Sequence, residues 1–365
     1  MRIAVIVASG LVLSVCAALA ACGSSSTTPS GFSGTGDDNG EGDDAAGGDA
    51  GTGVGVTGGF GGSTGGFAKG GGGPMSEDSG VDAGPPLVYA HTDDTLYSVD
   101  PTTNQATLVG QFSTSDVITD LAVNGNGDVY VNSEYFIFKA ALPATPPGAV
   151  TLTKIATIAG TNRFFALAFA PVGAIDDSIE ALIGGDINGM LWAIDQNTGE
   201  TTQLGNFGLD PQTAGNTMEL SGDLLFYTDA NGNPTGLATI RSCPTGTTNC
   251  GGDYLAGVDM AALKKAYSSK TPATTLLSGV YGSPGTGKLG PGTGFWEVFG
   301  LGAWNATVYG FTRHNSAQDS QLITIDTNSG VGSATSQTFA FTNGWSGAGV
   351  TTKVQVTVKA PPPVY

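Results

Sequence analysis

The chain has 365 residues, of which 13 are Lys or Arg and 31 are Asp or Glu, so its formal net charge is −18. Nucleic acids and anionic lipid surfaces bind basic proteins, and this charge balance argues against both as partners. The first 86 residues are too rich in glycine and too poor in large apolar side chains to join a core, which leaves about 280 residues for one sizeable domain.

The N-terminus has the features of an export signal. Arg2 supplies a positive charge, and an apolar run follows from Ile3 to Ala21. The run ends in Leu19-Ala20-Ala21-Cys22, which resembles the lipobox of bacterial lipoproteins. The resemblance implies that residues 1–21 are a signal peptide and that Cys22 is lipidated and becomes the new N-terminus. Cleavage at an ordinary secretory site among the same small residues is the alternative.

A Gly-, Ser- and Asp-rich segment follows the lipidated cysteine over residues 22–86. It cannot bury enough apolar surface to offset chain entropy, and we expect a disordered stalk with a mean span of about 45 Å. Gly23 after the cysteine resembles the sorting pattern of outer-membrane lipoproteins. The lipid anchor therefore predicts an envelope protein attached to the outer membrane, on its periplasmic or its surface side.

From residue 87 to residue 365 the pattern is all-β. Short apolar runs alternate with period two and are broken by Gly, Asn, Asp and Thr every eight to twelve residues or so. The exception is Met260–Tyr267, which has helical composition and follows a candidate N-cap, Asp259. We therefore expect one β-rich domain with a single short helix.

Two kinds of hairpin alternate along this domain. The first pairs two apolar strands, and its copies begin at Ile118–Val123, Phe165–Phe169, Met218–Leu220 (with Leu224–Tyr227 as the second strand) and Phe299–Ala303. The second has an apolar strand that ends in Asp, then a turn and a Thr-rich return strand, as at Leu96–Asp100, Leu191–Asp195 and Leu322–Asp326. Asp favours such turns because its carboxylate accepts backbone hydrogen bonds two residues on, so Asp100, Asp195 and Asp326 are predicted to be structural.

Two hairpins make a four-stranded sheet, and repetition of such sheets about an axis gives a β-propeller. Full pairs predict blades at 117–160, 164–208, 215–281 and 297–339. The unit at 87–113 is expected to pair with C-terminal strands at Gly347–Val350 and Val354–Thr357, which closes the ring. This gives about five blades, or six if the long fourth segment holds another.

One stretch of this repeat resembles a known family. Residues 193–199, Ala-Ile-Asp-Gln-Asn-Thr-Gly, are similar to the repeat of quinoprotein-like and WD40-like propellers. Together with the lipobox, the resemblance is to propeller lipoproteins of Gram-negative bacteria, and it implies fold rather than chemistry. Gln203 stands where quinoprotein blades place a docking Trp, so no quinone or other cofactor is expected.

Cys243 and Cys250 are the only cysteines of the folded part. An even pair in an exported domain predicts a disulfide across this short, turn-rich loop. A metal site is the alternative, but two thiolates with no nearby His are too few ligands.

Two further motifs resemble ligand-binding loops but depart from the required pattern. Residues 282–288 fit the GxxxxGK phosphate loop, but Leu289 replaces the Ser or Thr that binds magnesium, and Gly-Pro-Gly prevents the helix that should follow. Asp229, Asn231 and Asn233 resemble a calcium loop, but Pro234 stands where Gly is needed, so a hairpin turn is expected, with weak calcium binding as the alternative.

Catalytic signatures are also weak. The two histidines, His91 and His314, have no GxSxG motif beside them, and Gly344-Trp345-Ser346-Gly347 lacks its last glycine and is expected to open the closing strand. We therefore predict no catalytic, cofactor or metal residues.

The leading hypothesis is a monomeric, membrane-anchored lipoprotein that displays a non-catalytic propeller for an unidentified protein or carbohydrate ligand. The alternative is a calcium-dependent propeller enzyme, either a lactonase or a glycoside-active hydrolase. Such an enzyme would use carboxylates in the channel, for which Glu180, Glu219 and Glu297 are candidates. A ring of carboxylates at one mouth of the channel would favour the enzyme, and an apolar channel would favour binding.

Overall fold

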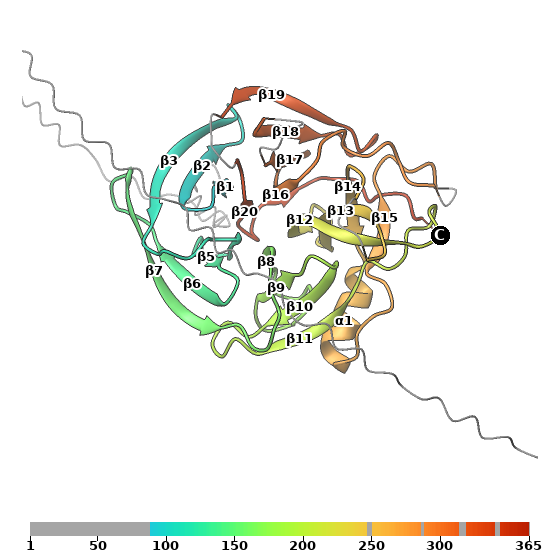
Figure 1. Cartoon of the computed structure of the whole chain (residues 1–365), viewed down its shortest axis with the longest axis horizontal. Helices are drawn as coiled ribbons and strands as arrows, with labels where there is room; N and C mark the ends of the chain where they lie inside the picture. Colours follow the sequence, from blue (N-terminus) through green and yellow to red (C-terminus); the bar gives the residue numbers. More distant parts are fainter. Residues whose placement is uncertain (1–87, 247–249, 286–287, 314–318, 340–343, 365) are drawn as a thin grey trace, which may run out of the picture. The chain divides into compact units, whose positions relative to one another are not determined.

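The computed structural model describes residues 88–246, 250–285, 288–313, 319–339 and 344–364. The predicted signal, Cys22 and the stalk lie outside the described residues. Within them, the strands form five four-stranded antiparallel units around a central axis, with outer strands such as β3, β7 and β11 at the rim (Figure 1). The described part is therefore a five-bladed β-propeller. None of the helices in this part is both long enough and apolar enough to cross a membrane.

Each blade runs from an inner strand at the axis to an outer strand at the rim. Blade 1 contains β20 (Gly347–Val350), β1 (Val88–His91), β2 (Thr95–Asp100) and β3 (Gln105–Phe112). Blade 2 contains β4 (Asp120–Val123), β5 (Val129–Asn132), β6 (Phe136–Ala141) and β7 (Gly148–Thr157). Blade 3 contains β8 (Ala166–Ala170), β9 (Ala181–Gly185), β10 (Met190–Ile194) and β11 (Thr201–Asn206).

The remaining two blades have the same order of strands. Blade 4 contains β12 (Asn216–Asp229), β13 (Pro234–Pro244), β14 (Asp253–Val258) and β15 (Leu277–Val280), with α1 (Met260–Ser269) between its last two strands. Blade 5 contains β16 (Val298–Trp304), β17 (Thr307–Thr312), β18 (Gln321–Ile325) and β19 (Gly332–Thr338). The long fourth segment thus holds a helix and not a sixth blade.

The two ends of the domain meet in blade 1, as predicted. β20 pairs antiparallel with β1, from Val88 opposite Val350 to His91 opposite Gly347. The most C-terminal strand of the blade is therefore its innermost strand, beside the most N-terminal one. This closure covers the sheet edges that an open ring would expose.

Two strand predictions were wrong. Met218–Leu220 and Leu224–Tyr227 are not partners but parts of one strand, β12, in which an irregularity between Leu220 and Leu224 replaces the expected turn. The C-terminal pair at Val354–Thr357 does not join blade 1. Instead β21 (Gln355–Val356) pairs in parallel with Thr228 and Asp229 of β12, because blade 1 already has four strands and the inner edge of β12 accepts the chain there.

The predicted local signals are confirmed. Asp195 accepts hydrogen bonds from the amides of Asn197 (2.8 Å) and Thr198 (3.1 Å), and Asp100 and Asp326 accept equivalent bonds two residues on. α1 begins after Asp259, whose carboxylate accepts a hydrogen bond from the amide of Ala262 at 2.9 Å. Each aspartate thus fixes the point at which the chain turns or enters a helix.

The hydrophobic core lies between neighbouring blades. Leu167, Leu182 and Tyr130 pack in a cluster between blades 2 and 3, and larger clusters fill the other interfaces. The outer strands β3 and β7 also pair in parallel, which joins blades 1 and 2 at the rim. At Gly110 this pairing leaves no room for a side chain, since a Cβ would lie 1.5 Å from the carbonyl oxygen of Gly148.

Candidate functional site

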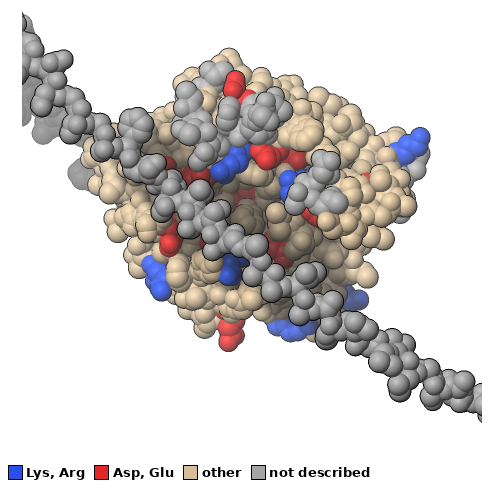
Figure 2. Space-filling view, in the orientation of Figure 1, with Lys and Arg blue, Asp and Glu red and all other residues tan. Residues whose placement is uncertain are grey.

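A pocket of about 600 Å³ opens at one mouth of the central channel, and residues of all five blades line it. Figure 2 shows this face with a central hollow and with acidic and basic side chains around it. The apolar wall consists of Val117, Ile118, Tyr135, Phe165, Ile187, Leu220 and Phe299. The charged residues of the lining are Asp93, Asp116, Glu134, Asp186, Arg241 and Arg313. The volume is within the range of small-molecule sites.

The topology explains why these residues converge. The turns between the second and third strands of blades 1, 2 and 3 carry Asp93, Glu134 and Asp186, and these turns surround the mouth. Phe165 and Ser346 directly precede the inner strands β8 and β20. Side chains far apart in sequence therefore meet where the inner strands begin.

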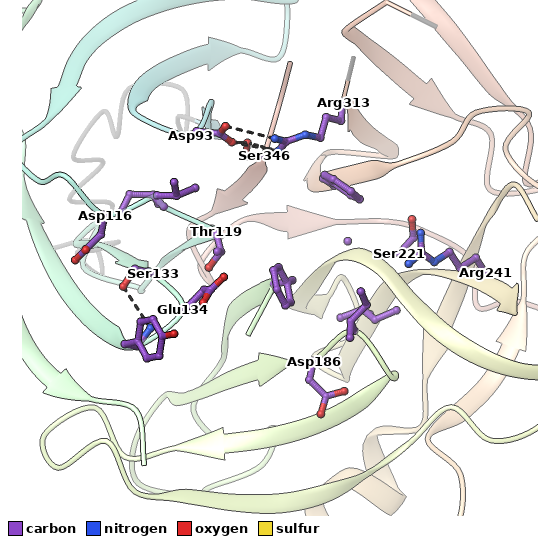
Figure 3. Close-up of a pocket in the computed structure, with 18 of the residues that line it drawn as sticks. Asp93, Asp116, Thr119, Ser133, Glu134, Asp186, Ser221, Arg241, Arg313 and Ser346 are labelled. Atoms are coloured by element: carbon purple, nitrogen blue, oxygen red, sulfur yellow. Dashed lines mark hydrogen bonds and ion pairs between the residues drawn. The ribbon is translucent and has the colours of Figure 1, made fainter. Parts of the chain in front are cut away.

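An ion pair links blades 1 and 5 across the rim of the pocket (Figure 3). The guanidinium of Arg313 donates hydrogen bonds to both carboxylate oxygens of Asp93, at 3.1 and 3.3 Å, and to Oγ of Ser346 at 2.9 Å. Ser346 in turn donates to Asp93 at 2.5 Å. The carboxylate of Asp93 is thus neutralised, and the hydroxyl of Ser346 is occupied by the same pair.

A second arginine pairs with an acid on the opposite rim. Nε of Arg163 lies 3.7 Å from the carboxylate of Glu134, and its guanidinium stacks 3.9 Å from the centre of the Tyr135 ring. A third arginine, Arg241, reaches the pocket from β13 beside Ser221 (Figure 3). Its Nε is buried and has no hydrogen-bond partner in the part of the chain that the structure describes. Of the three arginines of the described residues, Arg241 and Arg313 thus line the pocket, and Arg163 contacts its lining through Glu134 and Tyr135.

Two buried aspartates lie directly after residues of the pocket lining, Thr119 and Gly222. Asp120 begins β4 and Asp223 lies in β12, and neither side chain is exposed to solvent. Asp120 accepts hydrogen bonds from the amides of Leu121 (2.8 Å) and Leu167 (2.5 Å). Asp223 accepts from the amides of Leu224 and Leu301, each at 2.6 Å. These carboxylates bind backbone groups of four inner strands and are therefore structural.

The two carboxyls also interact with each other. Burial raises the pKa of both well above the ordinary value, and the pKa of Asp120 is raised further by the charge of Asp223. Such a pair shares a proton, as like charges in contact cannot both ionise. Further along the axis the lining is apolar, with Ala122, Phe169, Phe226 and Val350 among its residues.

His91 lies beside this pair and is fully buried. Its Nδ1 is 2.6 Å from the carbonyl oxygen of Thr92, while its Nε2 lies 4.0 Å from Oδ1 of Asp120 and has no hydrogen-bond partner. Burial lowers the pKa of His91 to about 4, so the ring is neutral at physiological pH. His314 lies outside the described residues.

The three glutamates considered as channel acids do not meet at the pocket. Glu180 accepts hydrogen bonds from the amide of Gly125 and from Thr352, and it lines a different depression beside α1. Glu219 lies beside the disulfide, and Glu297 precedes β16 outside the pocket lining. The sequence missed the residues that do line the mouth, because separate strands and turns of different blades supply them.

The remaining motifs have structural roles. Cys243 and Cys250 form the predicted disulfide, with an S–S distance of 2.04 Å. Asp229 accepts hydrogen bonds from the amides of Asn231 and Asn233, which makes the predicted hairpin turn between β12 and β13. In the described residues of 281–297 no helix or strand follows the GxxxxGK sequence, as expected of a loop. Gly344-Trp345-Ser346 leads into β20, as predicted for the start of the closing strand.

No protein-family model and no curated protein sequence matches this chain. Among solved structures, a protein of unknown function from Bacteroides caccae is similar, with a TM-score of 0.36 and 11% identity, and the match covers 73% of this chain and 99% of that one. BamB from Moraxella catarrhalis is similar with a TM-score of 0.28 and 13% identity, covering 67% and 70% of the two chains. Kuenenia stuttgartiensis hydrazine synthase is similar with a TM-score of 0.30 and 12% identity, and the match covers 70% of this chain and 67% of that one. Likeness at this level concerns architecture only, and the sheet order of the chain itself defines the propeller.

Proposed function

We propose that this protein is a lipid-anchored envelope protein whose propeller binds an apolar ligand in the mouth pocket without transforming it. The observation that carries the proposal is the pocket itself, a space of about 600 Å³ with an apolar wall and contributions from all five blades. Clefts of this size and lining are the usual form of small-molecule sites. The stalk and the lipid at Cys22 would hold this pocket at a membrane surface.

The pairing of the acids supports binding over hydrolysis. A hydrolase of this kind would need two carboxylates directed at the same bond. Asp93 is paired with Arg313, and Glu134 is paired with Arg163. Asp186 accepts hydrogen bonds from the amides of Asn188 and Met190. The axial pair Asp120 and Asp223 accepts hydrogen bonds from backbone amides and is buried. Asp116 is the remaining acid of the lining, and one carboxylate does not supply the pair that such hydrolysis needs. Because these carboxylates are engaged by groups of the protein itself, the mouth favours a binding role over hydrolysis.

Filling the pocket should abolish binding of an apolar probe. Ile187 lies on the wall with 47% of its surface exposed, so Ile187→Trp is expected to occupy the space without disturbing the core. We expect the neutral dye N-phenyl-1-naphthylamine to bind the chain Gly23–Tyr365 and the variant to weaken binding at least ten-fold in a fluorescence titration. Val172→Trp, at a position 56% exposed outside the pocket lining, is the matched control. Equal binding by wild type and both variants, or no binding by any, would contradict the proposal.

The anchor is tested separately. Cys22→Ala is expected to abolish incorporation of labelled palmitate and to release the protein from the membrane fraction. Cys16→Ala, inside the predicted signal, leaves the acceptor intact and should retain the label. A wild-type chain that takes up no label, or a Cys22→Ala chain that keeps it, would remove the anchor from the proposal.

A further inference from the structure

We infer that the ligand of the mouth pocket is an apolar organic acid whose anionic group pairs with Arg241. This inference rests on the proposed function and specifies its ligand. The cations of this protein are scarce, since Lys and Arg number 13 against 31 acidic residues. Of the three arginines of the described residues, Arg241 and Arg313 line this pocket, and Arg163 contacts two residues of its lining.

The three arginines differ in what they contact. Arg313 is neutralised by Asp93 and Arg163 by Glu134, so that each has an acid of the protein itself as its partner. Among the described residues, the side chain of Arg241 has no ion pair within 4.0 Å and no hydrogen bond, and its buried Nε lacks an acceptor. Arg241 lowers the pKa of the buried Asp253, but Asp253 accepts its hydrogen bonds from Ser221 and from the amide of Val298.

An incompletely paired guanidinium in a partly buried site is costly unless an acceptor satisfies it. An anionic ligand in the pocket supplies an acceptor to this guanidinium and can bind two of its three nitrogens at once. Phe165, Phe299 and Leu220 line the same pocket and would bury an apolar body. Asp116 and Asp186 also line the pocket, and they would repel a ligand with several negative charges. The lining therefore fits one acidic group joined to an apolar body of small-molecule size.

Two dyes with the same ring system separate charge from shape. 8-Anilino-1-naphthalenesulfonate is an anion, and N-phenyl-1-naphthylamine is its neutral counterpart. In titrations of the chain Gly23–Tyr365 we expect both dyes to bind. We expect Arg241→Gln to weaken binding of the anionic dye at least ten-fold and to change binding of the neutral dye less than two-fold. Arg241→Lys keeps the charge and should retain most of the anion binding. Arg163→Gln is the matched control, because Arg163 is already paired with Glu134. It should change the binding of the two dyes equally.

The outcomes separate the inference from the proposed function. If neither dye binds wild type, the proposed function is wrong. If both bind but Arg241→Gln affects them alike, the pocket binds apolar ligands and the inference about Arg241 is wrong. If Arg241→Gln fails to fold, the wild type still tests the inference. Raising the salt from 50 mM to 500 mM should weaken binding of the anionic dye several-fold and leave binding of the neutral dye unchanged. Competition by decanoate but not by decanol extends the result to carboxylic acids, and equal competition by both would contradict it.

Discussion

Gly347→Ala is expected to destabilise the propeller by more than about 3 kcal/mol. A Cβ at this position would lie 2.1 Å from Oδ1 of Asp120 and 2.6 Å from Nε2 of His91. Gly347 has no unusual φ, so the effect is one of space alone. The added methyl group can be accommodated only if the carboxylate or the imidazole moves.

Neither neighbour can move cheaply. Asp120 is held by the amides of Leu121 and Leu167, and displacing its carboxylate would leave both amides buried without an acceptor, at about 1–3 kcal/mol each. The imidazole of His91 is fully buried, with its Nδ1 against the carbonyl oxygen of Thr92. Because Gly347 also begins the strand that closes the ring, the strain acts where the two ends of the domain pair.

Urea unfolding monitored by circular dichroism measures this change. Gly251→Ala is the control, because its backbone does not have positive φ, and no heavy atom of the described residues, apart from its chain neighbours, lies closer than 4.0 Å to the added Cβ. The control should stay within about 0.5 kcal/mol of wild type. A loss for Gly347→Ala no larger than that of Gly251→Ala would show that the axial cluster is not packed as described.

The repeat in the sequence predicted most of the fold. Asp195, followed by Asn and Gly, sets a turn by local hydrogen bonds, so each hairpin of this kind has its own signal in the sequence. From these signals the sequence predicted the boundaries of four blades and the closing strand. The errors arose where a contact is not local. Ser221, Gly222 and Asp223 resemble a turn, but Asp223 instead binds Leu301 of the next blade and keeps β12 continuous.

The site was less predictable for the same reason. The residues of the mouth come in short, separate segments from the strands and turns of five blades, and no linear motif contains them. Asp120 and Asp223 offered one signal, since each directly precedes an apolar inner segment, Leu121–Val123 or Leu224–Phe226. A polar residue repeated at that place indicates a group directed at the axis. The pairing of Arg313 with Asp93, 220 positions apart, has no such signal.

The second large effect is a pH-dependent gain in stability from Asp253→Asn. Asp253 begins β14 and is 1% exposed, and burial raises the pKa of its carboxyl to about 6 from an ordinary value of 3.8. The folded protein therefore binds this proton more tightly than the unfolded chain does. The stabilising contribution is complete below about pH 4, is lost as the pH rises, and is gone above about pH 6.

The size of the effect follows from the difference in pKa. About two pKa units correspond to about 3 kcal/mol of unfolding free energy lost by wild type between pH 4 and pH 7. Asn is neutral throughout this range, and its carbonyl oxygen can still accept the hydrogen bonds of Ser221 (2.7 Å) and of the Val298 amide (2.6 Å). The variant should therefore gain on wild type by up to about 3 kcal/mol over this interval.

Urea unfolding of both chains at pH 4, 5, 6 and 7 gives this difference directly. His91 acts in the opposite direction, because its pKa is lowered to about 4 and its contribution is lost as the pH falls below about 6.5. That contribution is common to both chains and cancels in the difference between them. A difference that stays constant from pH 4 to pH 7 would mean that Asp253 does not titrate in this range. A difference that rises with pH shows that Asp253, the buried hydrogen-bond partner of Ser221 in the pocket lining, holds its proton more tightly in the folded protein than in the unfolded chain.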